Sequence, residues 1–194
     1  MRKLTIITVL CLLLMSVNIL AVSAEEETQP SITKASIAII PYINSTEETK
    51  GYIKEIVDAK YTEQYSNKNF QIIPLVETQK ALNIAGFDTS NKELPDKDIL
   101  AIVAEKTNAD YVIAMEISQL ITTRHMSMFQ MKVVTKAKLR YKVYNVKQSK
   151  LVTFQVTGAS ENKTVFGDVG YRDPITKALN QAMDEANVKI LNSL

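Results

Sequence analysis

The sequence predicts a mixed α/β fold: a five-stranded sheet with parallel βαβ crossovers first, an antiparallel meander next, and a C-terminal helix. Two observations carry this prediction. Up to residue 108, short apolar runs alternate with stretches of helical periodicity, which is typical of parallel strands joined by helices. From residue 109, apolar residues recur at every second position, which is typical of half-buried antiparallel strands. The helices are expected mainly on one face of the sheet, opposite a cationic face.

The first 24 residues have the pattern of a secretory signal peptide. Arg2 and Lys3 precede a mainly apolar run, and Val22 and Ala24 supply the small residues that signal peptidase recognises. Cleavage is therefore expected after Ala24, and the mature protein is expected in the periplasm or outside the cell. A retained anchor is the alternative, because the apolar run approaches the length of about 20 residues that spans a bilayer.

Cleavage would remove Cys11, the single cysteine of the chain, so the mature protein could form no disulfide. Leu10 precedes Cys11 where a lipoprotein signal needs a small residue, so no lipid anchor is predicted. Arg2 and Lys3 would also leave, and these two residues account for the whole formal net charge of +2. The mature charge therefore gives no argument for nucleic acid as a partner.

Residues 25–34 are expected to form a flexible lead-in, and residues 35–194 a single domain. Apolar runs at residues 36–42 and 70–74 predict buried strands that each end at a proline. Helices are predicted at residues 77–85 and 96–107 and from residue 173 nearly to residue 194. Another helix is predicted to start at a capping box formed by Ser45 and Glu48.

Residues 110–143 predict two long strands joined by a short tip at residues 124–128, and residues 151–157 predict a third strand folded back beside them. One face of the second long strand carries five cations. Residues two positions apart on a strand share a face and lie about 7 Å apart, so these cations form a row. They are Lys132, Lys136, Lys138, Arg140 and Lys142.

These five cations predict a ridge that binds an acidic partner or an anionic polymer. A solvated sheet face, partly neutralised by acids such as Glu116, is the simpler interpretation. Aromatic residues are sparse on this side, where Tyr144 stands alone, so nucleic acid is not predicted as a partner.

The tip is rich in methionine, with Met126 and Met128 beside His125 and with Met131 nearby. Clustered thioethers and an imidazole in an exported protein suggest a weak metal site for Cu(I). Met131 is expected to face away from Met126 and Met128, which weakens that interpretation. Methionine also suits a tip that contacts a partner. No other metal and no cofactor is predicted.

An enzyme is not predicted. His125 is the single histidine, and neither Ser118 nor Ser127 lies in the turn motif of serine hydrolases. The glycines at 158, 167 and 170 match neither a dinucleotide fingerprint nor a phosphate-binding loop.

Three segments carry a resemblance: SIAIIPYIN at residues 36–44, FQIIPLVETQKALNIAG at residues 70–86, and ILAIVAEKTNADYVIAMEI at residues 99–117. With the strand pair and the last helix, they resemble the family that groups the curli-secretion protein CsgG, the N-terminal domain of TolB and the outer-membrane lipoprotein activators of penicillin-binding proteins. The resemblance implies an extracytoplasmic α/β domain that acts by protein contact in envelope assembly or export, without chemistry of its own.

The partner implied by the resemblance is another envelope protein or protein complex. The predicted contact surface is the row of five cations together with Met126 and Met128. Self-association stays open, and no stable transmembrane segment is expected once the signal peptide is removed. Small-ligand or metal binding at His125, Met126 and Met128 is the alternative function.

Overall fold

The computed structural model describes residues 34–66, 70–88, 90, 92–128, 130–165 and 170–193. The predicted signal peptide and its cleavage site lie outside these residues, as does nearly all of the predicted lead-in. Within the described residues, no helix is both long and apolar enough to cross a membrane. The elements in chain order are β1 (Ala35–Ile39), β2 (Ile43–Asn44), α2 (Tyr52–Tyr65), β3 (Phe70–Ile72), α3 (Leu75–Ile84), α4 (Lys97–Thr107), β4 (Tyr111–Met126), β5 (Met131–Asn145), β6 (Lys150–Thr164) and α5 (Arg172–Leu191).

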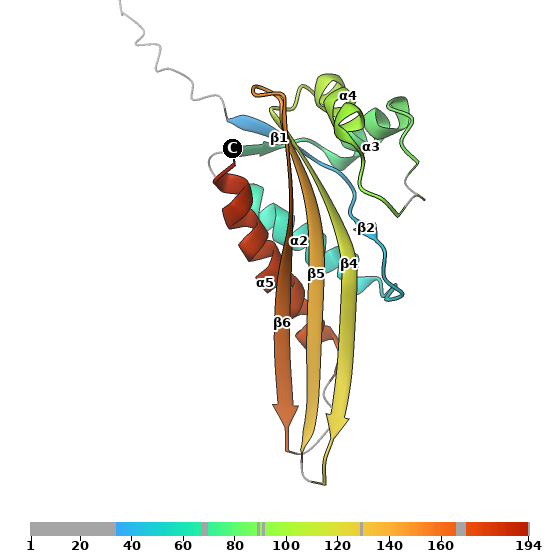
Figure 1. Cartoon of the computed structure of the whole chain (residues 1–194), viewed down its shortest axis with the longest axis vertical. Helices are drawn as coiled ribbons and strands as arrows, with labels where there is room; N and C mark the ends of the chain where they lie inside the picture. Colours follow the sequence, from blue (N-terminus) through green and yellow to red (C-terminus); the bar gives the residue numbers. More distant parts are fainter. Residues whose placement is uncertain are drawn as a thin grey trace, which may run out of the picture. The chain divides into compact units, whose positions relative to one another are not determined.

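The strands form one mixed sheet in the order β3-β1-β4-β5-β6, and the short β2 pairs with β4 (Figure 1). β1 runs parallel to both β3 and β4, whereas β4, β5 and β6 are antiparallel neighbours. The predicted mixed sheet, with its parallel crossovers, meander and C-terminal helix, is confirmed. β2 is the strand that the sequence did not predict.

Helices cover both faces of the sheet, so the expectation of helices mainly on one face was wrong. One core packs α2 and α5 against Ile37 and Ile113, and the other packs α3 and α4 against Ala38 and Val112. The reason is the strand order. β3 and β4 lie on opposite sides of β1, so two right-handed crossovers leave their helices on opposite faces.

Local signals located two helix ends correctly and one incorrectly. Asp96 caps α4, since its side chain accepts a hydrogen bond from the backbone N of Ile99 at 3.0 Å. Gly86 follows α3 with φ +72°, a left-handed conformation that suits glycine. The predicted capping box at Ser45 is wrong, because α2 begins only at Tyr52.

β6 extends to Thr164, seven positions beyond the predicted end of this strand at residue 157. Gly158, which looked like part of a loop, lies inside the strand. A Cβ at this position would lie 1.9 Å from the carbonyl oxygen of Ala178 in α5. The glycine therefore permits close packing of a helix on a strand and does not mark a turn.

Candidate interaction surface

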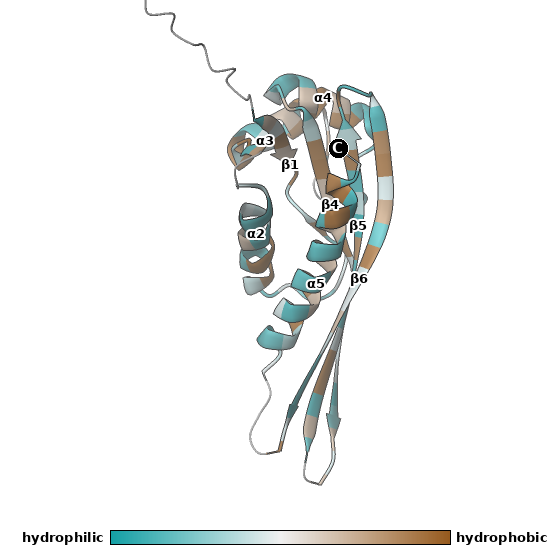
Figure 2. Ribbon diagram, turned by 90° about the vertical axis from the view of Figure 1, so that its left-hand side faces the viewer, coloured by the Kyte–Doolittle hydropathy of each residue, from teal (hydrophilic) through white to brown (hydrophobic). Residues whose placement is uncertain are grey.

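Three strands continue beyond the rest of the sheet and form a segment that we call the arm, made of residues 118–126 of β4, 131–138 of β5 and 157–164 of β6. β1 and β2 pair with β4 only as far as Ile117, so no described strand lies on the outer side of β4 in the arm. Figure 2 shows the three strands reaching past the end of α5 toward the tip.

A β-bulge at the base of the arm reverses the side-chain directions of β4. The register with β5 shifts between Ile117 and Gln119, which makes Ser118 the extra residue. Up to the bulge, odd-numbered side chains such as Ile117 belong to the core with α5. Beyond it, the even-numbered Leu120 packs against that core.

α5 covers one face of the arm. Beyond the contact at Gly158, the Ser160 hydroxyl donates a hydrogen bond to the carbonyl of Pro174 at 2.7 Å. The Asp173 carboxylate binds Lys177 at 2.9 Å and accepts a hydrogen bond from Asn162 of β6. These contacts hold the first turns of α5 against the arm and leave the opposite face of the arm uncovered.

This uncovered face, which we call the open face, carries the side chains that point away from α5 in the register of the three strands. They are Gln119, Ile121, Thr123 and His125 from β4, Lys132, Val134, Lys136 and Lys138 from β5, and Thr157, Ala159, Glu161 and Lys163 from β6. None of them is fully buried, and every one from β4 and β6 is exposed. Three of the five predicted cations lie here, and Arg140 and Lys142 continue the row toward α4.

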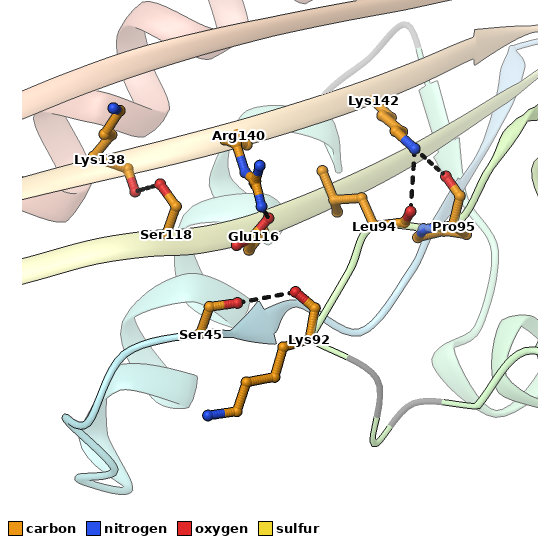
Figure 3. A network of polar contacts seen from close by, with 9 residues as sticks. All are labelled: Ser45, Lys92, Leu94, Pro95, Glu116, Ser118, Lys138, Arg140 and Lys142. Atoms are coloured by element: carbon orange, nitrogen blue, oxygen red, sulfur yellow. Dashed lines mark hydrogen bonds and ion pairs between the residues drawn. The ribbon is translucent and has the colours of Figure 1, made fainter.

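Arg140 is held by Glu116, its partner in the strand register (Figure 3). The Nε of Arg140 donates to Oε2 of Glu116 at 2.7 Å, and Nη2 lies 2.5 Å from the same oxygen. Glu116 is only 1% exposed, so its carboxylate would be costly to bury without this cation. Arg140 therefore has an internal role, although half of its side chain remains exposed.

Lys142 is also held within the domain. Its Nζ donates to the carbonyl oxygens of Leu94 at 3.1 Å and Pro95 at 2.9 Å (Figure 3). The lysine thereby ties the segment before α4 to the C-terminal part of β5. This use of a cation depends on a chain segment about 50 residues away, so strand periodicity alone could not show it.

The cations of the arm differ in their partners. Lys132 lies 2.5 Å from Glu161 across the β5–β6 pair, and Lys163 lies 2.6 Å from the same carboxylate. Hydrogen bonds from Lys132 first and Lys163 second lower the pKa of Glu161. Lys136 and Lys138 form no ion pair with any described residue. Of the five predicted cations, these two remain unpaired.

The tip differs from its prediction in one respect. Met126 and Met131 are partners in the register, so their side chains lie on the same side of the hairpin, and the expectation that Met131 faces away was wrong. His125 is adjacent to Met126 in the strand and therefore points to the other side. Met128 is 95% exposed at the end of the arm. His125 and the two facing methionines thus do not form one cluster.

Two shallow cavities of about 420 and 240 Å³ lie at the base of the open face and share Arg140 and Gln155. Their other lining residues are mainly polar or charged, including Glu93, Lys138 and Gln119. Small-molecule sites are more enclosed than these two shallow cavities, so the surface suits a protein partner better.

A third cavity, of about 440 Å³, lies where β1 and β3 end beside α2, and the sequence did not indicate it. Its lining is largely apolar and includes Ile39, Tyr42, Val57, Tyr61, Ile72 and Leu75. The carboxyl ends of parallel strands are where open α/β sheets bind ligands. Pro41 and Pro74, which follow the two strands, are the sequence feature from which this edge could have been located.

The serines considered for hydrolysis have other partners. The Ser118 hydroxyl donates to the carbonyl of Lys138 at 3.1 Å, and the Ser127 hydroxyl donates to the carbonyl of Gln130 at 3.0 Å. Neither is hydrogen-bonded to His125. Among the described residues, no group of three His, Cys, Asp or Glu side chains is arranged to hold a metal ion.

The fold and this surface define a mixed α/β domain with a projecting three-stranded arm. No protein-family model and no curated protein matches the chain. Solved structures of similar fold exist. Hypothetical protein CT253 from Chlamydia trachomatis has 16% identity and a TM-score of 0.50, over 82% of this chain and 95% of that one. Lipoprotein GNA1162 from Neisseria meningitidis has 12% identity and a TM-score of 0.47, over 82% and 99%.

The C-terminal domain of LpoB from Escherichia coli is also similar, with 12% identity and a TM-score of 0.42 over 65% of this chain and 82% of that one. At these identities the likenesses concern the fold alone. The family resemblance drawn from the sequence stays a prediction.

Proposed function

We propose that this chain is an exported protein that acts by protein contact in the bacterial envelope, without chemistry of its own, and that the open face of the arm is its contact surface. The observation that carries the proposal is the contrast between the two faces of the arm. α5 packs tightly on one face. The other face carries Lys136 and Lys138, which form no ion pair with any described residue, and the apolar Ile121, which is 50% exposed.

The chemistry of the open face indicates the partner. An apolar side chain beside two unpaired cations suits a protein surface that offers an apolar contact and carboxylates, because complementary charge raises the association rate and selects the partner. The N-terminal signal pattern and the resemblance to envelope proteins support an extracytoplasmic location for this contact.

Photo-crosslinking in intact cells tests the proposal. A photoreactive amino acid at Ala159 would sit on the open face opposite Lys136, in cells that make the full chain. We expect one discrete crosslinked protein. Reversing both charges with Lys136→Glu and Lys138→Glu should reduce that product by about tenfold or more, since the like charges would repel an acidic partner.

The matched control reverses Lys147 and Lys150, two exposed lysines at the opposite end of the same strand pair. Lys147→Glu and Lys150→Glu should leave the crosslink unchanged. Equal loss in both double variants would show that net charge matters and the open face does not. An unchanged crosslink in both would refute the proposed surface.

Metal binding at the tip remains the second candidate, and the facing of Met126 and Met131 is the observation in its favour. Two thioethers on one side of a hairpin could hold Cu(I). Titration of Cu(I) into the protein and into a variant carrying Met126→Leu and Met131→Leu tests it. Equal weak binding by both proteins would exclude a site at the tip.

A further inference from the structure

The two outer edges of the arm are treated differently, and α5 protects the edge formed by β6. The side-chain Oε1 of Gln181 accepts a hydrogen bond from the backbone N of Ala159 at 2.9 Å. The Nζ of Lys189 donates to the carbonyl of Gln155 at 3.3 Å. Backbone groups that would otherwise invite another strand are thus occupied by side chains of the same chain.

The edge formed by β4 has no such protection in the described structure. Before the bulge, the outward carbonyl of Ile117 accepts a hydrogen bond from the backbone N of Ser45 at 3.1 Å. The extra residue Ser118 shifts the alternation by one, so the backbone groups of Leu120 and Thr122 point outward beyond it. No described residue supplies a backbone partner for these two residues.

The chain leaves room beside this edge because it turns away after β2. Asn44 holds the turn, with its Oδ1 accepting from the backbone N of Thr46 at 3.1 Å and its Nδ2 donating to the carbonyl of Glu48 at 2.6 Å. A cavity of about 570 Å³ remains between residues 45–50 and β4 residues 118–122. The base of the edge is therefore open to an added strand.

The sequence of this edge favours pairing. Residues 119–123 contain no charge and no proline, and Ile121, Thr122 and Thr123 are β-branched residues that favour strands. Sheet edges of monomeric proteins commonly carry lysine or proline to prevent association. Ile121 in this stretch is 50% exposed, and Met126 at the end of β4 is 74% exposed.

We propose that this β4 edge pairs with the same edge of a second copy of the chain, giving an antiparallel two-fold dimer with a continuous sheet. The register is centred on Thr123. It places Thr123 opposite itself, Thr122 opposite Arg124, Ile121 opposite His125 and Leu120 opposite Met126. Each pair lies on a common face, and no two like charges meet at neutral pH, so the edge is complementary to itself. The second copy also covers Ile121 and Met126.

A cysteine at the two-fold axis tests this register. Thr123 would occupy a non-hydrogen-bonded pair, with the two Cα atoms about 4.5 Å apart, within the range that a disulfide spans. Cells that export the full chain would carry Thr123→Cys together with Cys11→Ala, so that the introduced thiol is the single one. Mild oxidation should then give a reducible product of twice the monomer mass.

The control is Thr157→Cys in the same background, because Thr157 is an exposed threonine on the open face at the protected β6 edge. We expect at least about fivefold less dimer from this variant. Adding Ile121→Lys to Thr123→Cys should reduce the dimer by a similar factor, since a charge is introduced into the paired edge.

Equal dimer formation at the two edges, or a Thr123→Cys dimer that Ile121→Lys does not reduce, would overturn the proposal. The outcome is independent of the contact proposed for the open face. The open-face contact is detected as a crosslink from position 159 to a different protein. The pairing of the β4 edges is detected as a disulfide between two copies of the chain.

Discussion

The same strands serve two different purposes at their two ends. In the part of the sheet that we call the head, where β1 pairs with β4 and β3 pairs with β1, both faces of β4 are covered. Val112 and Ile113 are therefore fully buried although they point in opposite directions. In the arm, Leu120 packs toward α5 whereas its neighbour Ile121 is half exposed. The head thus supplies stability on both faces, and the arm supplies it on one.

This difference separates residues that hold the fold from residues available for contact. Glu116 and Arg140 lie at the boundary between head and arm, where a charge pair is partly buried. Toward the tip, Lys132 and Lys163 pair with the exposed Glu161, and Lys136 and Lys138 form no ion pair with any described residue. Substitutions on the two faces should therefore differ in kind: inner-face changes should reduce stability, and open-face changes should alter binding with little effect on stability.

The largest expected effect is at the core residue Leu139, which is fully buried. Leu139→Ala should lower the free energy of unfolding by about 2–5 kcal/mol, because it removes buried methyl groups and leaves a cavity. Ile121→Ala on the open face should change it by less than about 0.5 kcal/mol. Urea denaturation of both variants measures the difference, and similar losses would mean that the open face is covered in the folded protein.

The contact between β6 and α5 should be the next most sensitive point. Gly158→Ala should cost about 1–3 kcal/mol, since its Cβ would meet backbone atoms of Ala178 and Ala182 that cannot rotate away. Gly51→Ala is the control, because a Cβ there meets nothing within 4 Å. Thermal unfolding of the pair gives the comparison. An unchanged melting temperature of Gly158→Ala would show that α5 does not pack on the arm as closely as described.

The boundary pair should respond unequally to loss of either partner. Arg140→Ala leaves the buried Glu116 carboxylate without its cation and should cost about 2 kcal/mol. Glu116→Gln leaves a half-exposed guanidinium that water can solvate, and should cost about 1 kcal/mol. Urea titrations of the two single variants and the double variant give the coupling energy. Equal single losses would contradict the burial of Glu116.

The smallest effect concerns pH at the attachment of α5 to the arm. Hydrogen bonds from Asn162 first and Lys177 second lower the pKa of Asp173 below its ordinary value of 3.8. The folded state therefore binds this proton less readily than the unfolded state does. The contribution of Asp173 is complete above the ordinary pKa and is lost as the pH falls through the lowered one.

In Asp173→Asn, the stability of the folded state should consequently fall less steeply as the pH is lowered into the acid range. Near neutral pH, its stability should vary with pH as that of the unmodified protein does. Melting temperatures measured from about pH 6 to about pH 2.5 test this window. Asp88→Asn is an informative comparison, since the pKa of Asp88 is also lowered but its partner is the nearby Ser90 in a loop. If the acid limb of Asp173→Asn matched that of the unmodified protein, the Asp173 carboxylate would not contribute to the loss of stability in acid.

Much of the fold followed from local signals. Apolar runs at residues 36–42 and 70–74 identified buried strands because parallel strands are covered on both faces. Asp96 and Gly86 marked helix ends because their backbone requirements are local. The capping box at Ser45 failed because this hydroxyl instead donates to the carbonyl of Lys92, far away in the sequence (Figure 3).

The candidate surface was predictable only in part. The alternation from Lys132 to Lys142 correctly placed the predicted cations on one side of β5. It could not show which of them have partners, because those partners come from Leu94, Pro95, Glu116 and Glu161 on other segments. The helices on the second face were missed for a related reason, since the strand order that puts them there is a non-local property.

The sequence by itself determined the succession of the longer strands and the helices along the chain, the export signal pattern and the cationic side of β5. Periodicity and capping depend only on residues close together in the sequence. The tertiary structure decided the rest. It paired Arg140 with a buried carboxylate and left Lys136 and Lys138 without an ion pair to any residue that the structure describes. It also covered one edge of the arm with α5, whereas no described strand covers the other edge. These outcomes depend on which segments meet in space, and no local pattern of residues encodes that meeting.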